Sequence, residues 1–290
     1  MTVSPGDIKG LHKYETLLLK TLERLMKKYL WVPEENIRKS SRLSASEMEY
    51  RLGQLMEKNM VKSSSVPYRG YQLTFSGYDA LAVTSLVKNG TVTAIGSLIG
   101  VGKESSVYEA LGPGALVLKL HCIGQRSFQS ARLNRGFMPE WNHFPWIFAS
   151  TYSARQEFEA LKALRKGGVN VPIPIAVNRN VVAMSYIAGA NLHQAVLEEP
   201  REVFDEIFEN IKKAYELGFI HNDLSEFNVM TDGDSVWIID WPQWIEPTHR
   251  NADEILLRDI SNITTYFAKK YNIVESPEKI RDMITGKTDA

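Results

Sequence analysis

The chain has 290 residues, 44% of them hydrophobic, so it can bury one large or two medium cores and is too apolar for a disordered protein. Its net charge is zero, but residues 1–90 hold 14 basic and 9 acidic residues, an excess that suits a polyanion and also arises by chance. With one cysteine, Cys122, and no apolar run as long as a signal peptide core or a membrane span, we expect a soluble, cytoplasmic protein without an intrachain disulfide.

Residues 1–90 have the pattern of a small helical unit that ends in a hairpin. Leu18, Leu22, Leu25 and Tyr29 recur at helical spacing and form one apolar face. A second, short helix is expected to start near Pro33. The segment "SASE" at 44–47 predicts a capping box at the start of a third helix, 44–58.

The end of this region predicts a wing. The segment "MVKSSSVPYRGYQLTFSG" alternates around a Pro/Gly turn, as a hairpin does, and "YDALAVTSLVKNG" is a further helix that ends at Gly90. The predicted domain is therefore a winged helix-turn-helix, with 44–58 as its recognition helix. The exposed face of that helix mixes charges, so protein docking or a structural role stays open beside nucleic-acid contact.

After Gly90 the pattern changes to strands, expected over 92–100, 106–112 and 116–121. Residues 124–150 show neither the apolar spacing of a helix nor that of a strand. The segment is too long for an inert connection, so we expect a functional flap or a partly disordered loop. Helices are expected over 153–168, 201–219 and from about Asn251 to Lys270, with short strands at 171–177, 181–189, 227–231 and 235–241.

Two glycines, Gly100 and Gly102, occur in "IGVGKESSVYEA", where a strand gives way to the next. Glycine there lets a backbone approach a phosphate closely, but hairpin turns use glycine for steric reasons too. No helix follows and Ser105 replaces the third glycine, so this is neither a dinucleotide motif nor a Walker motif. Lys103, Ser105 and Ser106 can instead donate to phosphate oxygens.

Lys119 lies in the middle of the apolar strand "LVLKLH". A buried lysine is costly without a partner, whereas a lysine on an edge strand is simply hydrated. Glu157, on the face of the following helix that also carries Leu161, can pair with Lys119 and aim it at nucleotide phosphates. Glu159 competes for this role, but it lies about 200° around the helix, so only one of the two glutamates can face the lysine.

The segment "HNDLSEFNVM" at 221–230 places Asp223 five residues before Asn228, and Asp240 follows at the end of an apolar strand. Phosphoryl transfer needs one carboxylate to orient the attacking hydroxyl, and an amide oxygen and a second carboxylate to hold Mg²⁺. Asp223 fits the first role, and Asn228 and Asp240 fit the other two. Asp and Asn are also ordinary turn residues, but the Gly loop, lysine, glutamate and aspartates occur here in the order of a kinase.

The segments "GVGKESSVYEA", "HNDLSEFNVM" and "IIDWPQW" resemble the three signature segments of the RIO family of atypical protein kinases, in the winged-helix-bearing, archaeal-type subfamily. This resemblance implies an α+β chain with a winged helix at 1–90, a kinase N-lobe at 91–187 with a flexible loop at 124–150, and a C-lobe at 188–290. It also implies Mg²⁺-ATP (or Mn²⁺-ATP), serine-directed (auto)phosphorylation or ATPase activity, and a monomer that matures the small ribosomal subunit by binding its precursor rRNA through the winged helix.

The resemblance also assigns roles to individual residues. Asp223 is the catalytic aspartate, Asn228 and Asp240 are the metal ligands, and Asp240 is able to accept the phosphoryl group itself. Lys119 and Glu157 support the nucleotide. Nucleotide contact falls on Gly100, Val101, Gly102, Lys103, Glu104, Ser105, Ser106 and Val107, and on the lobe-joining Met184, Tyr186 and Ile187. The candidate autophosphorylation sites are Ser127 and Ser130.

Two positions depart from the family pattern: Asn222 stands where Gly is usual, and Trp241 where Phe is usual. Two other functions remain open. One is a small-molecule kinase of the aminoglycoside or choline type, which usually needs a larger helical region after the second aspartate. The other is a winged-helix RNA-binding assembly factor whose kinase lobe binds nucleotide without turning it over.

Overall fold

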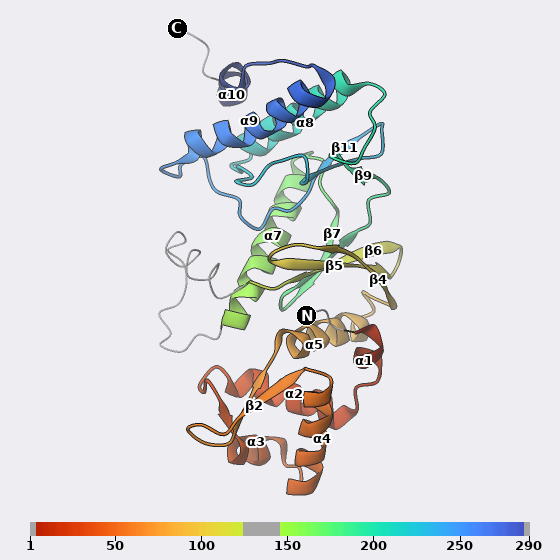
Figure 1. Cartoon of the computed structure of the whole chain (residues 1–290), viewed down its shortest axis with the longest axis vertical. Coiled ribbons are helices and arrows are strands. Elements are labelled where there is room, and N and C mark those ends of the chain that lie inside the picture. Colours follow the sequence, from red (N-terminus) through yellow and green to blue (C-terminus); the bar gives the residue numbers. More distant parts are fainter. Residues whose placement is uncertain (1–3, 124–145, 287–290) are drawn as a thin grey trace. The chain divides into compact units, whose positions relative to one another are not determined.

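The structure is a computed structural model that describes residues 4–123 and 146–286, so the candidate phosphorylation sites Ser127 and Ser130 lie outside the described residues. The chain forms two compact units. The first comprises Met1–Arg155 and Ile175–Ala183, and the second comprises Gln156–Pro174 and Met184–Ala290 (Figure 1). Within the described ranges, no helix is both long and apolar enough to cross a membrane.

The first unit begins with the predicted winged helix. Its three-stranded sheet has the order β1-β3-β2, and β1 comes from the connection between α2 and α3. Strand β3 pairs antiparallel with β2, and Val61 lies opposite Leu73. The wing hairpin is therefore as predicted. The elements are α1 (Pro5–Lys9), α2 (Lys13–Leu25), β1 (Val32–Pro33), α3 (Glu34–Ser41), α4 (Ala45–Glu57), β2 (Val61–Ser64), β3 (Gly70–Leu73) and α5 (Phe75–Lys88).

The predicted capping box at 44–47 forms only one of its two bonds. The Ser44 hydroxyl accepts a bond of 3.2 Å from the Glu47 N–H, but the Glu47 carboxylate instead accepts from Arg51 Nε at 2.8 Å. A complete capping box occurs at the start of α2, where His12 is the N-cap and its own N–H donates to Glu15 at 3.1 Å. Sequence analysis missed this box because histidine is an uncommon N-cap.

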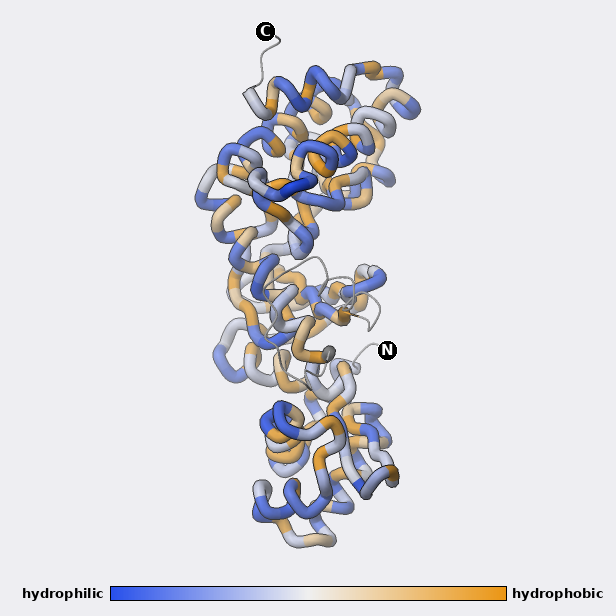
Figure 2. Tube along the Cα trace, turned by 90° about the vertical axis from the view of Figure 1, so that its left-hand side faces the viewer, coloured by the Kyte–Doolittle hydropathy of each residue, from blue (hydrophilic) through white to orange (hydrophobic). Residues whose placement is uncertain are grey.

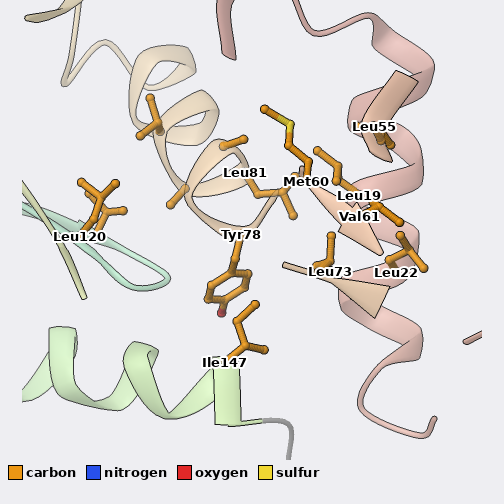
Figure 3. Packing of buried hydrophobic residues seen from close by; sticks show 14 of the residues in the cluster. Leu19, Leu22, Leu55, Met60, Val61, Leu73, Tyr78, Leu81, Leu120 and Ile147 are labelled. Carbon is orange, nitrogen blue, oxygen red and sulfur yellow. The ribbon is translucent and has the colours of Figure 1, made fainter. Parts of the chain in front are cut away.

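A five-stranded sheet of order β4-β5-β6-β8-β7 completes the first unit. It makes β6 a central strand. Helix α5 is buried along most of its length, because its residues join the winged-helix core and the core beside the sheet in one apolar cluster (Figure 3). The strands are β4 (Ala94–Val101), β5 (Ser105–Leu111), β6 (Ala115–His121), β7 (Pro174–Asn178) and β8 (Val181–Ser185).

The second unit packs amphipathic helices beside a small sheet of order β11-β10-β9. Along these helices hydrophobic and hydrophilic residues alternate, as the hydropathy colouring shows (Figure 2). The short helix α10 (Pro277–Thr285) is absent from the predicted elements, although Ser276 caps it by accepting from the Lys279 N–H. The other elements are η1 (Trp146–Phe148), α7 (Ala149–Lys166), which begins in the first unit, β9 (Ala190–Asn191), α8 (Pro200–Glu216), β10 (Val229–Thr231), β11 (Val236–Ile238) and α9 (Ala252–Tyr271).

Candidate active site

The predicted phosphate loop is the connection between β4 and β5 in the first unit. Gly100 lies inside β4 and pairs with Val107, so only Gly102 of the two glycines is in the connection itself. The loop is closed by a 2.8 Å bond from the Gly102 N–H to the Ser105 carbonyl, and Val101, the last residue of β4, is exposed and lies opposite Ser106. Glu104 is also fixed, because its carbonyl accepts from the Cys122 N–H at 2.7 Å. The connection carries two charged side chains, Lys103 and Glu104, and the hydroxyls of Ser105 and Ser106 follow as the first residues of β5.

Lys119 lies next to this loop in the sheet, because it is directly opposite Val107 in the β5–β6 pair. Only 6% of Lys119 is exposed, and β6 is a central strand. The alternative of a hydrated lysine on an edge strand is therefore wrong. A buried ammonium needs compensating charge or hydrogen bonds, as a lysine that serves a nucleotide would have.

In the second unit, the two competing glutamates lie on different faces of helix α7. Glu157 is 1% exposed and lies on the buried face with Leu161, whereas Glu159 is exposed and pairs with Lys162 at 3.1 Å. The Glu157 Oε1 atom accepts a 3.3 Å bond from the backbone N–H of Trp241, the residue after Asp240. Glu157 therefore supports the peptide next to the predicted metal ligand, a contact that the sequence did not predict.

The register of one hairpin brings Asn228 and Asp240 together. Strands β10 and β11 pair antiparallel with Val229 opposite Ile238, and the Ile239 N–H donates to the Asn228 carbonyl at 3.0 Å. Asp240 is thus one residue beyond the position opposite Asn228. It has φ +68°, a left-handed conformation that Asp adopts more readily than most residues with a side chain.

Asp223 is held in the loop before this hairpin by backbone contacts on both sides. Its N–H donates to His221 Nδ1 at 3.2 Å, and its carbonyl accepts from the Asn228 amide nitrogen at 2.8 Å. Because Nδ1 accepts, the proton of His221 is on Nε2, which donates to the Ile239 carbonyl at 2.8 Å. Partial burial, together with the negative charge of Asp240, raises the pKa of the Asp223 carboxyl. Asp223 and Asp240 are therefore close enough to interact electrostatically.

Asn222, the position at which the family usually has Gly, has φ +68°. This left-handed conformation suits Gly and, among residues with a side chain, suits Asn best, which explains the replacement. The Asn222 side chain also donates to the Gln243 carbonyl at 2.9 Å. Its backbone N–H donates to Asp259 Oδ2 at 2.7 Å, and Arg258 Nη2 donates to its carbonyl at 2.8 Å.

Asp259, on α9, accepts a bond from the backbone next to Asp223 and is not among the predicted site residues. It is 1% exposed, and burial raises the pKa of its carboxyl while Arg258 and the Asn222 N–H oppose that rise. Asp259 is buried together with Leu256, Ile260 and Ile263, which recur at helical spacing along α9. A carboxylate within that apolar stripe was the signal that could have identified it.

The residues beside Asp240 fit a bound Mg²⁺. The Asn228 amide directs its nitrogen at the Asp223 carbonyl, so the other amide atom, Oδ1, is the oxygen that can serve as a ligand. Trp241, which replaces the usual Phe, is fully buried; its ring lies 4.5 Å from that of His221 and its Nε1 donates to the Ile238 carbonyl at 3.0 Å. The larger aromatic therefore fills the core and keeps Asp240 in place.

The segment predicted to contact adenine begins in β8, which ends with Met184 and Ser185, and continues just beyond this strand. Met184 is buried, Tyr186 is exposed and Ile187 is half-buried. Ser185 ties this segment to the chain near 173, through a bond from its N–H to the Ile173 carbonyl and one from the Ile173 N–H to its hydroxyl, both 2.9 Å. The boundary between the two compact units falls just before Met184.

The fold, the buried strand lysine and the loop that joins Asp223, Asn228 and Asp240 define the class of protein-kinase-like phosphotransferases. Residues 106–280 match the RIO domain family, and residues 8–89 match the Rio2 N-terminal family. The chain belongs to the RIO family of serine/threonine protein kinases, within its winged-helix-bearing branch.

Curated relatives and solved structures agree with this assignment. The RIO-type serine/threonine-protein kinase Rio2 of Methanocaldococcus jannaschii is 41% identical over 88% of this chain and 96% of its own length. The serine/threonine-protein kinase rio2 of Dictyostelium discoideum is 33% identical over 94% of this chain, which spans only 53% of that relative. The crystal structure of the Rio2 kinase-ADP/Mg²⁺-phosphoaspartate complex from Chaetomium thermophilum has a TM-score of 0.82 and 27% identity, and covers 100% of this chain and 91% of that one. The predicted family and fold class are confirmed, and the small-molecule kinase alternative is not supported.

Proposed function

We propose that this chain is an ATP- and Mg²⁺-dependent serine/threonine kinase or ATPase that autophosphorylates and acts in the cytoplasm on the maturing small ribosomal subunit. The observation that carries the proposal is the joint placement of Asp223, Asn228 and Asp240 by the β10–β11 register. The name of the Chaetomium relative, which holds ADP, Mg²⁺ and a phosphoaspartate, supports the same chemistry.

In the proposed reaction, Asp223 orients an attacking hydroxyl or water at the γ-phosphate and receives its proton as the new P–O bond forms. The bond from the γ-phosphorus to the β,γ-bridging oxygen breaks at the same time, and ADP leaves with that electron pair. Its raised pKa, caused by partial burial and by Asp240, favours this proton transfer. Lys119 and the Gly100–Val107 loop, with its donors Lys103, Ser105 and Ser106, hold the phosphates. Mg²⁺, when held by Asn228 and Asp240, supplies charge neutralisation of the phosphates.

Asp240 is also the proposed acceptor of a phosphoryl group. A carboxylate oxygen of Asp240 forms a bond to the γ-phosphorus, the bond to the β,γ-bridging oxygen breaks, and ADP leaves with that electron pair. Water then hydrolyses the acyl phosphate, which returns the carboxylate and releases inorganic phosphate. In this cycle ATP turnover resets the enzyme, and no peptide acceptor is needed.

The test uses ATP labelled at the γ-phosphate, with Mg²⁺, on the wild type, Asp223→Ala and Asp240→Ala. We expect phosphate release by the wild type and a loss of at least about 100-fold in both variants, because each removes a group needed in the transition state. Glu254→Ala, which removes an exposed carboxylate on α9, is the matched control and keeps full turnover. Equal turnover in all four proteins would refute the proposed site.

Protein-bound label separates the two acceptors. An acyl phosphate on Asp240 is removed by hydroxylamine, whereas phosphoserine is not. Label that survives hydroxylamine and persists in Asp240→Asn would assign the acceptor to serine instead, for example Ser127 or Ser130.

The winged helix is the proposed contact with precursor small-subunit rRNA. Support comes from the excess of basic residues in 1–90 and from the match to the Rio2 N-terminal family. Binding of the full chain to transcribed small-subunit rRNA at several salt concentrations tests this partner, because phosphate contacts make affinity fall steeply with salt. No binding even at low salt would contradict it.

A further inference from the structure

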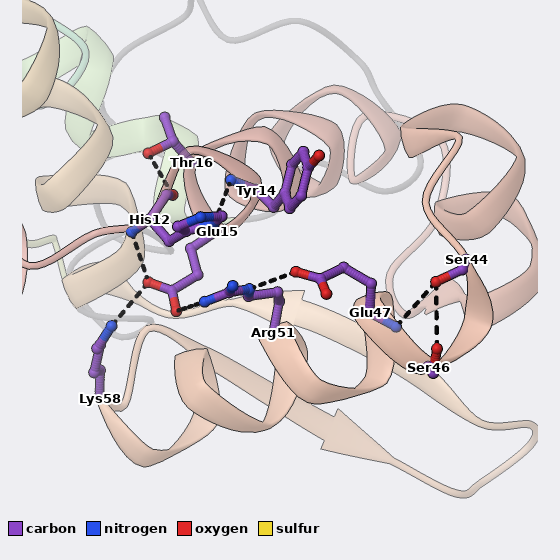
Figure 4. A network of polar contacts seen from close by, with 9 residues as sticks. All are labelled: His12, Tyr14, Glu15, Thr16, Ser44, Ser46, Glu47, Arg51 and Lys58. Carbon is purple, nitrogen blue, oxygen red and sulfur yellow. Dashed lines mark hydrogen bonds and ion pairs between the residues drawn. The ribbon is translucent and has the colours of Figure 1, made fainter.

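The helix expected to read nucleic acid, α4, carries no cation that is available to a phosphate on its outer face. Arg51, its only basic residue, bonds to Glu47 at 2.8 Å and lies 3.7 Å from Glu15. Lys58, the C-cap, bonds to Glu15 at 2.8 Å (Figure 4). Glu15 is 2% exposed, so both cations are drawn toward the domain interior.

What α4 presents outward is acidic. Glu57 is exposed and has no ion pair among the described residues, whereas the exposed Glu49 pairs with Arg69 at 3.1 Å. Tyr50, the residue after Glu49, is 58% exposed. A face with carboxylates repels a phosphate backbone. Insertion of α4 into a groove, the mode by which helix-turn-helix proteins read DNA, is therefore opposed by its own charges.

The first long helix, α2, has the opposite character. Its exposed residues recur every three or four positions, as one face of a helix does, and continue into the turn after Leu25. All but Leu17 are basic. This basic stripe consists of Lys13, Lys20, Arg24, Lys27 and Lys28.

The charges of the stripe are not neutralised by other described residues of the chain. Among the described residues none of its five members has an ion pair, and only Lys13 has a contact of another kind, a cation–π interaction with Tyr14 at 5.0 Å. The two acidic residues of α2 are engaged elsewhere: Glu15 with Lys58, and Glu23 with Arg179 at 2.7 Å. From Lys13 to Arg24 the stripe extends about 16 Å along the helix.

Stabilisation of the helix itself does not account for the stripe. Cations near a helix C-terminus interact favourably with the helix dipole, which explains Arg24. Lys13 is the first residue of α2, where the dipole disfavours a cation, and Lys20 lies mid-helix. Lys20, Arg24 and Lys27 also repel one another at these spacings. The stripe therefore costs the fold a little stability and is consistent with an external anion.

We propose that the basic stripe on α2, and not the recognition helix α4, binds the phosphate backbone of RNA. Double-stranded RNA has a major groove too narrow and deep for side chains to read, so proteins contact its phosphates and 2′-hydroxyls from outside. A straight helix with lysines on one side suits that mode and needs no groove-reading helix. This inference rests on the proposed rRNA partner and states which surface engages it.

The test measures binding of the full chain to transcribed small-subunit rRNA as salt is varied. The variant Lys20→Gln/Arg24→Gln/Lys27→Gln removes three cations from the stripe. We expect affinity to fall by at least roughly ten-fold at low salt, and the slope of log affinity against log salt to decrease by roughly 2 to 3, because three fewer counterions are displaced. Its ATP turnover is expected to stay at the wild-type value, and its melting temperature is expected to stay the same or rise slightly because mutual repulsion is relieved.

Two matched controls keep the test specific. Arg165→Gln/Lys166→Gln/Lys279→Gln removes the same number and types of charge from other exposed positions, and Tyr50→Ala alters the outer face of α4. Both are expected to bind as the wild type does. If Tyr50→Ala abolishes binding while the stripe variant binds normally, α4 is the reader and the inference is overturned.

The remaining outcomes separate this inference from the proposed function. If the wild type fails to bind the rRNA at any salt concentration, the proposed partner is wrong. If the wild type binds and the stripe variant binds equally well with the same slope, the partner stands and the stripe is not its contact. Stronger stripe-dependent binding to polyglutamate than to rRNA would assign the stripe to an acidic protein and would also overturn the inference.

Discussion

Asn222 shows how one backbone angle can position the proposed catalytic residue, Asp223. Its φ of +68° would strain most residues that have a Cβ atom, with Asn and Asp as the exceptions. The Asn222 side chain also donates to the Gln243 carbonyl. We expect Asn222→Ala to lower the unfolding free energy by about 1–3 kcal/mol and to lower kcat, because Asp223 follows directly. Asn222→Gly relieves the strain and is expected to recover most of the melting temperature and turnover. Equal losses in both variants would show that the side-chain bonds, not the angle, are what matters.

Asp79 is a buried carboxyl outside the site whose ionisation affects stability. Asp79 lies on α5 and accepts a 2.6 Å bond from the Asn180 side-chain amide. The same amide nitrogen donates to the His121 carbonyl at 2.9 Å. Burial and the Asp79 charge raise the thiol pKa of the nearby Cys122 to about 11. Burial raises the pKa of Asp79 to about 7, from 3.8 for the unfolded chain.

The pKa of Asp79 predicts a stability that falls with pH. Between about pH 4 and about pH 7 the folded state holds a proton that the unfolded state has lost, so the unfolding free energy decreases as pH rises through this window and levels off above it. Asp79→Asn mimics the protonated form. We expect it to reduce this slope and to be more stable than the wild type at pH 8 by up to a few kcal/mol. Urea unfolding at pH 5, 6, 7 and 8 measures both effects; parallel curves for the two proteins would contradict the assignment.

At the scale of elements, α9 acts as the support of the catalytic loop. Asp259 accepts from the Asn222 N–H, and Arg258 donates to the Asn222 carbonyl. We expect Asp259→Ala to lower kcat by about 10- to 100-fold with little change in KM for ATP, because it misplaces Asp223 without touching the nucleotide. Asp253→Ala, on the exposed side of the same helix, is the control. A rise in KM with unchanged kcat would contradict the positioning role.

The elements that carry the candidate site could be predicted from the sequence because local residue patterns define them. The alternation in 227–241 predicts two strands, and a tight turn between them fixes the register that places Asn228 beside Asp240. Other elements were not accessible. Helix α10 is nine residues long with only two buried residues, Ile280 and Ile284, so its apolar period is short. The burial of Lys119 depends on β8 lying beside β6, a pairing between strands about 60 residues apart that no local pattern encodes.

At the scale of the whole molecule, the winged helix and the five-stranded sheet share one apolar core within the first unit. A small apolar cavity lies between α1, α5 and the sheet, lined by Pro5, Ile8, Val83, Ile95, Tyr108, Leu118 and Leu120. Polar bonds within the first unit add to this packing. Tyr78 on α5 bonds to Thr151 on α7 at 2.7 Å, and Arg179, after β7, holds Glu23 on α2 with bonds of 2.7 and 2.9 Å. The spacing of apolar residues changes from that of helices to that of strands at Gly90. This change does not reveal that the winged helix and the sheet share one core.

Removal of residues 1–90 is therefore expected to destabilise what remains. The cut exposes the apolar sheet face around Leu118 and Leu120 and leaves the Arg179 guanidinium without its carboxylate partner. We expect the fragment 91–290 to bind a hydrophobic dye, to aggregate, and to melt well below the full chain, since each buried leucine that becomes exposed costs about 2 kcal/mol. Arg179→Ala in the full chain breaks the polar link alone and is expected to lower stability by about 1–3 kcal/mol without dye binding. A fragment that stays monomeric, binds no dye and melts with the full chain would show that the winged helix contributes nothing to the stability of the sheet.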